Sequence, residues 1–161
     1  LVDHIESTHH RFLHEELPRL AALTDKVVDV HGSRHPELHN VKISFTALRD
    51  DLEPHLMKEE QVLFPMIREL AAATTVPTFH CATLANPIRM MLLEHDRAGE
   101  LLAELRELTT GFEPPTDACA SYQALYRGLA EVEADTHLHV HKENNVLFPA
   151  VLALEDALST R

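Results

Sequence analysis

The sequence predicts an all-α protein, folded as an antiparallel up-down four-helix bundle with a metal centre in its core. Four long stretches have helical periodicity and are separated by turn-forming residues, and no stretch alternates with the period of a strand. One phrase, a His followed by a Glu four residues later and by a Leu-Phe-Pro close, occurs twice, at His55–Pro65 and at His139–Pro149. Residues four apart share one face of a helix, so each His–Glu pair has metal-ligand spacing.

The first two helices are expected over residues 1–30 and 37–73. The first stretch is helix-forming apart from Pro18, and it ends before the turn-prone run His-Gly-Ser-Arg-His-Pro at 31–36. The second contains the first copy of the repeated phrase. A connection this short between long helices favours antiparallel neighbours.

The last two helices follow a loop at residues 74–86, which shows no periodicity. The third helix is expected over about 87–110, where a Gly and a Pro-Pro pair then end it. Thr116 or Asp117 is expected to cap a fourth helix that continues to about residue 158 and contains the second copy of the phrase.

Three prolines count against uninterrupted helices. Pro54, Pro65 and Pro149 lie inside the second and fourth stretches, and a proline in a helix interior costs about 3 kcal/mol or bends the axis. We therefore expect kinks at these positions. Pro65 and Pro149 occupy the same place in the two copies of the phrase, which indicates that bending is part of the design.

Length and composition narrow the class of protein. The 161 residues, 45% of them apolar, suffice for one domain with a sizeable core, and we assign residues 1–161 to one domain. No apolar run is long enough to span a bilayer and no signal peptide opens the chain, so we expect a soluble, cytoplasmic protein with no membrane partner. The absent initiator Met suggests that an upstream segment is missing.

Charge and cysteine content exclude further classes. The formal net charge of −12 opposes the basic surface that nucleic-acid binding requires, so we expect no nucleic-acid partner. Cys81 and Cys119 are isolated, which indicates two free thiols in a reducing compartment rather than a zinc ribbon or a disulfide framework. The thirteen histidines are the unusual feature that needs an explanation.

The inward-facing rows of the two phrase-bearing helices combine apolar residues with ligand types. Steps of three and four residues define each row. In the second helix the row is Phe45, Leu48, Leu52, His55, Glu59, Val62 and Met66. In the fourth it is Leu125, Leu129, Val132, Thr136, His139, Glu143, Val146 and Ala150. His137 and His141 do not share this row, so His139 is the ligand candidate among the three.

The other two helices each contribute a single His to the core. The first row contains His10, Leu13, Leu17 and Leu20, and the third contains Ile88, Met91, His95, Ala98, Leu102 and Leu105. Six buried polar groups without partners would each cost about 1–3 kcal/mol, so something must satisfy them together. Four imidazoles and two carboxylates with no thiolate suit iron or manganese better than structural zinc, and two carboxylates able to bridge favour a dinuclear centre.

These motifs resemble the hemerythrin-like domain of the family called repair of iron centres. The resemblance rests on the two His-x-x-x-Glu elements, on the lone His of each other helix, on the Glu-Asn-Asn-Val-Leu-Phe-Pro run that ends at Pro149, on Met57–Ile67 and on Glu94–Leu102. It covers essentially the whole chain. It implies a non-haem di-iron protein that helps to repair iron–sulfur clusters damaged by nitrosative or oxidative stress, with nitric-oxide chemistry at the di-iron site.

The resemblance also implies a ligand set. His10, His55, His95 and His139 become the terminal imidazole ligands of two iron ions, and Glu59 and Glu143 become bridging carboxylates, with an oxo bridge expected between the irons. Oxygen-carrying hemerythrins use a fifth His and an Asp, for which no inward position here offers a match. Fewer protein ligands leave coordination positions open, which favours reactivity or iron transfer over oxygen carriage.

Two functions stay open at this point. The first is iron donation or nitric-oxide reduction during cluster repair, with damaged iron–sulfur proteins and small ligands such as nitric oxide or oxygen as partners. The alternative is a hemerythrin-like module that senses or stores oxygen, nitric oxide or iron without turnover. A homodimer and a nitric-oxide reductase activity are left open too. Family members commonly carry a short N-terminal domain with adjacent cysteines. No such segment is in the sequence, either because it was removed or because this homologue lacks it, so no role is assigned to those thiols.

Several other residues carry more modest expectations. His9 and His14, which flank His10, are expected near the centre or at the surface without binding metal. Glu94 is expected either to move protons and line an access path or to be solvated. Tyr122 and Tyr126 are expected to pack at the core edge, and His80 with Cys81 to lie away from the metal. Solvated side chains are expected for four further histidines, namely His4, His31, His35 and His39.

Overall fold

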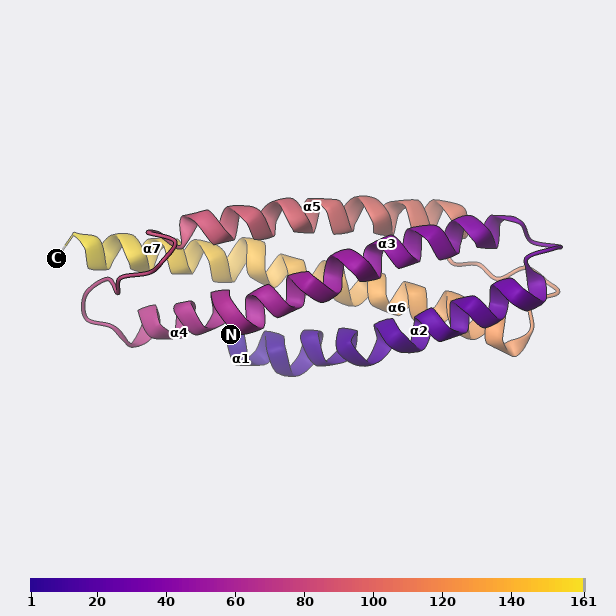
Figure 1. Cartoon of the computed structure of the whole chain (residues 1–161), viewed down its shortest axis with the longest axis horizontal. Coiled ribbons are helices and arrows are strands. Elements are labelled where there is room, and N and C mark those ends of the chain that lie inside the picture. The colour runs from indigo at the N-terminus through magenta and orange to yellow at the C-terminus, as the bar shows by residue number, and fades with distance from the viewer. Residues whose placement is uncertain (161) are drawn as a thin grey trace.

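Four long helical rods make up the protein (Figure 1). The computed structural model describes residues 1–160. Three of the rods contain a short π-helical segment, labelled η. The rods are α1 (Val2–Ile5), η1 (Glu6–His10) and α2 (Arg11–His31); α3 (Glu37–Lys58), η2 (Glu59–Leu63) and α4 (Phe64–Ala72); α5 (Ala85–Leu108); and α6 (Ala120–Lys142), η3 (Glu143–Leu147) and α7 (Phe148–Ser159).

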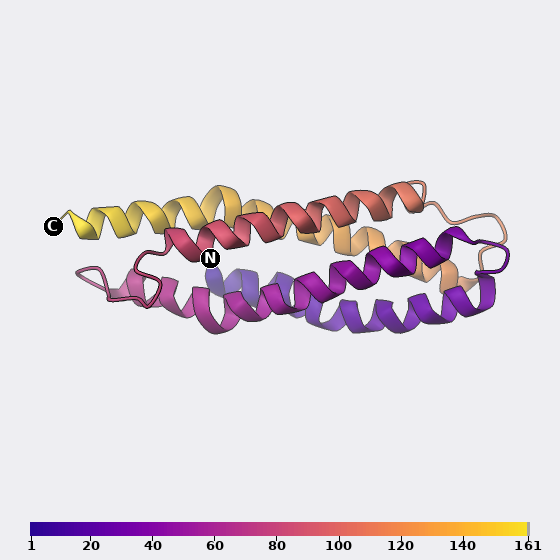
Figure 2. The same cartoon turned by 45° about the horizontal axis from the view of Figure 1, so that its top comes forward.

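Successive rods run in opposite directions, which confirms the predicted up-down bundle (Figures 1 and 2). The expected helix ends agree within about three residues. The predicted caps of the fourth helix, Thr116 and Asp117, are wrong. Cys119 occupies the N-cap position with extended backbone, and its side chain makes no capping hydrogen bond. Asp117 is instead an acceptor for the imidazole of His35, so its carboxylate serves the neighbouring turn.

The π-helical segments explain how two prolines are accommodated. Pro65 and Pro149 each lie two residues beyond the end of a π-helical segment, η2 or η3. Proline lacks an N–H, and its ring crowds the carbonyl four residues earlier, so a wider turn at that point removes the clash. A kink was expected at each of these prolines. The structure has a π-helical turn just before each of them. At Pro54, by contrast, α3 stays α-helical.

The extra residue in each π-helical turn changes which side chains face inward. Val62 and Val146, predicted to be buried, are 40% and 50% exposed, whereas their neighbours Leu63 and Leu147 are 1% and 6% exposed. Ala150 is also exposed, contrary to prediction. A row built on steps of three and four assumes an unbroken α-helix, and a π-helical turn rotates everything after it.

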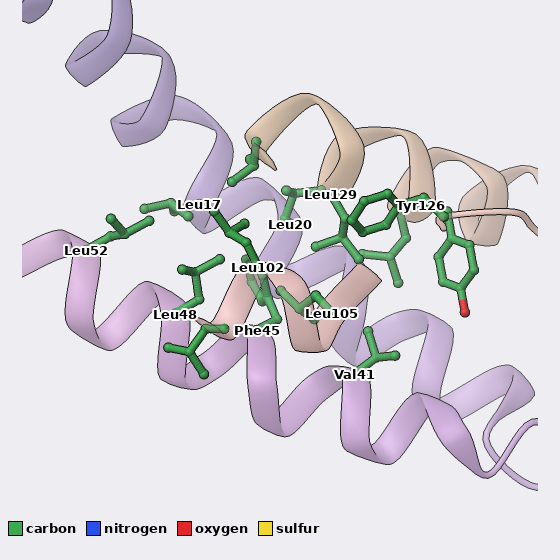
Figure 3. Close-up of a cluster of buried hydrophobic side chains, with 14 of the residues drawn as sticks. Leu17, Leu20, Val41, Phe45, Leu48, Leu52, Leu102, Leu105, Tyr126 and Leu129 are labelled. Atoms are coloured by element: carbon green, nitrogen blue, oxygen red, sulfur yellow. The ribbon is translucent and has the colours of Figure 1, made fainter. Parts of the chain in front are cut away.

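Two apolar clusters fill the bundle, one on each side of its middle. The larger cluster joins α2, α3, α5 and α6 towards the end where the loops at 32–36 and 109–119 lie, and Figure 3 shows part of it. The smaller joins α1, α4, α5 and α7. Tyr122 and Tyr126, predicted at the core edge, are buried in the larger cluster, with their hydroxyl groups 3.3 Å apart. None of the described helices is long and apolar enough to cross a bilayer.

Close approach of α2 to α6 depends on Gly128. A Cβ atom at this position would lie 2.5 Å from Cδ2 of Leu20, which is fully buried. At Gly99 of α5, by contrast, an added Cβ would have free space. Apart from the chain neighbours and the nearby backbone of the same helix, no heavy atom of the described residues would lie within 4 Å of it. The two glycines therefore form a matched pair within one bundle.

We expect Gly128→Ala to destabilise the protein by about 1–3 kcal/mol, because the added methyl overpacks the α2–α6 contact. Gly99→Ala should instead stabilise it by up to about 1 kcal/mol, since alanine loses less entropy in a helix. Chemical denaturation of both variants, compared with the parent at one metal content, measures the difference. Equal effects of the two substitutions would contradict the assigned role of Gly128.

The loops at 32–36 and 109–119 are joined through His35. Its Nε2 lies 3.0 Å from Asp117 and its Nδ1 lies 3.1 Å from Glu37, so this half-buried side chain is not freely solvated as predicted. The hydrogen bond to Asp117 raises the pKa of His35, against the smaller effect of burial, and the same contact holds the pKa of Asp117 below its usual range. His31 was also predicted to be solvated, and it is buried.

We expect Asp117→Asn to lower Tm at about pH 5.5 and to have little effect at pH 9. The raised pKa of His35 means that its ion pair stabilises the fold below the ordinary His value and is lost as pH rises through the folded value. Asn keeps an acceptor and removes only the charge. Thermal unfolding of both proteins at both pH values tests this, and an equal loss of Tm at the two values would refute it.

Candidate metal centre

Six ligand-type side chains from all four rods meet between the two apolar clusters. Each is less than a tenth exposed, and both carboxylates are fully buried. The structure therefore brings together every residue that the sequence selected as a ligand candidate: His10, His55, Glu59, His95, His139 and Glu143. Three of them lie at the edge of a π-helical segment, His10 as the last residue of η1, Glu59 as the first of η2 and Glu143 as the first of η3.

The six side chains form two overlapping groups of four. His10 and His139 belong to the first group, His55 and His95 to the second, and both groups share the two carboxylates. Within each group, one ligand atom per residue lies within 4.8 Å of the others. Glu143 shows the sharing directly, because its Oε1 lies 3.0 Å from Nε2 of His139 and its Oε2 lies 3.2 Å from Nε2 of His95. The arrangement can hold two ions.

Hydrogen bonds at the far side of the rings fix the orientation of three imidazoles. Nδ1 of His10 lies 2.9 Å from Glu60 Oε1, and Nδ1 of His55 lies 2.9 Å from Glu94 Oε2. Nδ1 of His95 lies 2.8 Å from Asn144 Oδ1. Each of these oxygens accepts a hydrogen bond, which holds the proton on Nδ1 and leaves the lone pair of Nε2 directed at the centre.

The imidazole pairs are spaced as ligands of one ion. Nε2 of His55 and Nε2 of His95 lie 3.2 Å apart, and the same distance separates Nε2 of His10 and His139. Two nitrogens bound to one metal ion at about 2.1 Å are separated by about 3.0–3.4 Å. When the proton of each ring is on Nδ1, two lone pairs face each other across this gap, and a cation between them removes the repulsion.

The carboxylates also require a cation. Both oxygens of Glu59 and Oε2 of Glu143 are buried without a hydrogen-bond partner among the described residues. Burial disfavours the charged form of Glu143, but the adjacent imidazoles of His139 and His95 outweigh it and hold the pKa of this carboxyl well below its usual range. Burial lowers the pKa of His55, which favours its neutral form, whereas at His10 and His95 burial is outweighed by Glu59 and Glu143, which raise the pKa of each ring. The donor set and the unpartnered atoms therefore fit a metal site.

Two of the residues that accept a hydrogen bond from a ligand imidazole occupy the same position in the two copies of the repeated phrase. This role was not predicted for them from the sequence. Glu60 and Asn144 each directly follow a shared carboxylate, and each binds the lone His of another rod. Glu94 directly precedes His95 and supports His55, so it contacts a ligand candidate and is not merely solvated.

The residue that corresponds to Glu94 in the first half of the chain is His9, and it behaves differently. Its ring is buried and stacks on His139 with the ring centroids 5.4 Å apart, while its Nδ1 lies 2.8 Å from Asp135. His9 therefore adjoins the centre without contributing to either group of four, as predicted.

The remaining histidines are placed much as expected. His137 and His141 are exposed and lie outside both groups, so α6 presents only His139 of this cluster to the centre. His14 is half exposed and binds Glu60, with Nε2 2.8 Å from Oε1. Cys81 packs against the smaller apolar cluster, where its sulfur lies 4.0 Å from that of Met66.

The chain is similar to proteins of known family. The family described as Hemerythrin HHE cation binding domain matches residues 1–151. A probable iron-sulfur cluster repair protein of Haemophilus influenzae is 41% identical over 152 residues, which cover 94% of this chain and 64% of that protein. The iron-sulfur cluster repair proteins YtfE of Salmonella schwarzengrund and Escherichia coli O1:K1 are each 37% identical, over 96% of this chain and 66% of the relative. The chain thus spans about two thirds of the length of these curated relatives.

We expect a substitution that removes a side chain shared by both groups of four to lower the metal content more than one that affects a single group. Glu59→Ala removes a side chain shared by both groups and should bind least metal, whereas His139→Ala affects one group and should retain more. His137→Ala, a control on the same helix, should bind as much metal as the parent. Elemental analysis of proteins loaded and desalted in parallel gives the order. Metal loss in His137→Ala with full binding in His139→Ala would contradict the assignment.

Proposed function

The chain belongs to the hemerythrin HHE cation-binding domain family, and we propose that it is a non-haem di-iron protein. His10 and His139 hold one iron, His55 and His95 hold the other, and Glu59 and Glu143 bridge the two, together with an oxo group. The observation that carries this proposal is the pair of overlapping groups of four that share two buried carboxylates. Two ions held in this way convert all the unpartnered carboxylate oxygens into ligands.

The proposed ligand set leaves the centre incompletely coordinated by protein. Each group of four would offer an iron ion two imidazoles and two carboxylates, which is fewer donors than an octahedral ion accepts. When bound, a di-iron centre supplies redox chemistry and open positions for a small ligand such as nitric oxide or oxygen. The chain's own residues set which atoms face these positions, because Glu60, Glu94 and Asn144 fix three of the four rings.

Polar side chains connect the centre with the surface by hydrogen bonds, whereas apolar clusters fill the bundle on each side of it. Glu60 joins His10 to the half-exposed His14, and Glu94 joins His55 to the exposed amine of Lys58. Both paths lead from a ligand imidazole to the surface. These carboxylates hold the imidazole rings and place negative charge between the centre and the surface, which supports a role in iron exchange.

We propose that this centre helps to repair iron–sulfur clusters damaged by nitrosative or oxidative stress. Its partners would be damaged iron–sulfur proteins in the cytoplasm, and its action would be iron donation, nitric-oxide reduction or both. The names of the relatives, at 37–41% identity over more than nine tenths of this chain, support repair over a sensor or storage module. The part of those relatives that this chain does not span is not needed to assemble the six ligand candidates.

We expect the iron-loaded chain to restore activity to an iron–sulfur enzyme inactivated by nitric oxide or peroxide. The metal-free chain and Glu59→Ala, loaded in the same way, should restore little, because neither presents a complete di-iron centre. Enzyme activity is followed together with nitric-oxide consumption, so that iron donation and nitric-oxide reduction are separated. Reversible oxygen binding without any recovery of enzyme activity would overturn repair in favour of a sensor or storage role.

A further inference from the structure

The end of the bundle far from the metal centre contains a histidine–cysteine pair. Cys119 is exposed at the N-cap of α6, and His31 is the last residue of α2. Nε2 of His31 lies 3.1 Å from the sulfur of Cys119. The α-helix from Arg11 to His31 separates this pair from His10 by about 30 Å. The pair is therefore independent of the ligand set.

The position of Arg34 indicates which group donates the hydrogen bond between His31 and Cys119. Nη2 of Arg34 lies 3.4 Å from Nδ1 of His31, and a guanidinium can only donate. Nδ1 of His31 is therefore the acceptor, and the ring proton is on Nε2. That N–H donates to the sulfur of Cys119, so the sulfur is held as an acceptor, the role that suits a thiolate.

Packing keeps the donor aimed at the sulfur. His31 is 4% exposed, and its ring lies against Tyr122 with the centroids 5.3 Å apart. The sulfur also stands at the N-terminus of the 23-residue helix α6, where free backbone N–H groups favour negative charge. A buried donor and a helix N-terminus thus converge on a sulfur that solvent reaches, and this combination characterises nucleophilic cysteines.

Cys81 provides the contrast within the same chain. It is half-buried, and the contact found for its sulfur is with Met66 at 4.0 Å. It lies in the loop before α5 and is not at a helix cap. The protein therefore contains one thiol next to a hydrogen-bond donor, Cys119, and one without such a donor among residues 1–160, Cys81.

We propose that Cys119 is a reactive thiol that exchanges with low-molecular-weight disulfides such as oxidised glutathione. The sulfur of Cys119, as the thiolate, attacks one sulfur of the disulfide. A new sulfur–sulfur bond forms to Cys119, the original one breaks, and the leaving thiolate takes a proton from solvent. Cys119 is oxidised and one glutathione is reduced, so the added disulfide is the only oxidant. The exposed guanidinium of Arg34, which also lies 3.7 Å from Asp117, supplies a cation for a glutathione carboxylate on a chain of net charge −12.

Single-cysteine variants test the proposal with oxidised glutathione as the probe. Cys81→Ser retains Cys119 and Cys119→Ser retains Cys81, and both are used as the iron-loaded protein. Mass spectrometry follows formation of the mixed disulfide in the folded protein and in denaturant, where the two thiols lose their surroundings. We expect folded Cys119 to react about tenfold faster than denatured Cys119, whereas folding should slow Cys81. An equal or slower rate for folded Cys119 would overturn the proposal.

Two further variants in the Cys81→Ser background test the donor. His31→Phe keeps a ring against Tyr122 but removes the N–H. It should cancel most of the increase in the rate at which folded Cys119, compared with denatured Cys119, reacts with oxidised glutathione. Arg34→Gln changes an exposed residue, so it should leave the fold intact and reduce the gain in part. Circular dichroism and metal content verify folding. If neither substitution slows Cys119 in a folded protein, the histidine–cysteine pair has no role in its reactivity.

Discussion

Two fully buried carboxylates, with three of their four oxygens lacking a hydrogen-bond partner among the described residues, determine how the centre of this bundle has to work. Glu59 and Glu143 lie between apolar clusters that exclude water, and an unpaired charge in such a place costs several kcal/mol. Among residues 1–160, the ion pairs of these two carboxylates are with imidazoles and not with Lys or Arg. Three of these imidazoles have their Nδ1 proton engaged on the outer side. A metal cation bound among these groups would satisfy the centre, and the rest of the bundle is arranged around this requirement.

The chain meets this requirement by using one design twice. Each half contributes a rod with a lone His and a rod with a His-x-x-x-Glu phrase, and the residue after each shared carboxylate supports the lone His of another rod. The π-helical turns belong to the same design. Glu59 and Glu143 begin η2 and η3, and the prolines that follow make an unbroken α-helix unfavourable there. In each copy, the ligand candidate, the π-helical turn and the proline therefore lie within seven residues of the sequence.

Much of this architecture follows from periodicity, and the exceptions have physical causes. The helices and all six ligand candidates could be predicted because rows of three and four residues hold as far as His55, Glu59, His139 and Glu143. The rows fail immediately afterwards, at Val62 and Val146, because a π-helical turn adds a residue to the helix. The prolines at 65 and 149 predict a bend there, but not the rotation of the inward-facing row. His31 was placed in solvent because it adjoins a turn, and only the fold brings Tyr122 and Cys119 against it.

The two halves are not equivalent, and the difference falls on one ligand. Glu94 accepts a hydrogen bond from His55, whereas the corresponding residue of the first half, His9, stacks on His139 and leaves Nδ1 of that ring without a partner among the described residues. A carboxylate that accepts from Nδ1 makes an imidazole a stronger donor to metal and fixes its orientation. The position held by His55 and His95 therefore has two supported rings, and the position held by His10 and His139 has one. In the proposed di-iron centre, this asymmetry would make the group of His55 and His95 hold its ion more firmly than the group of His10 and His139.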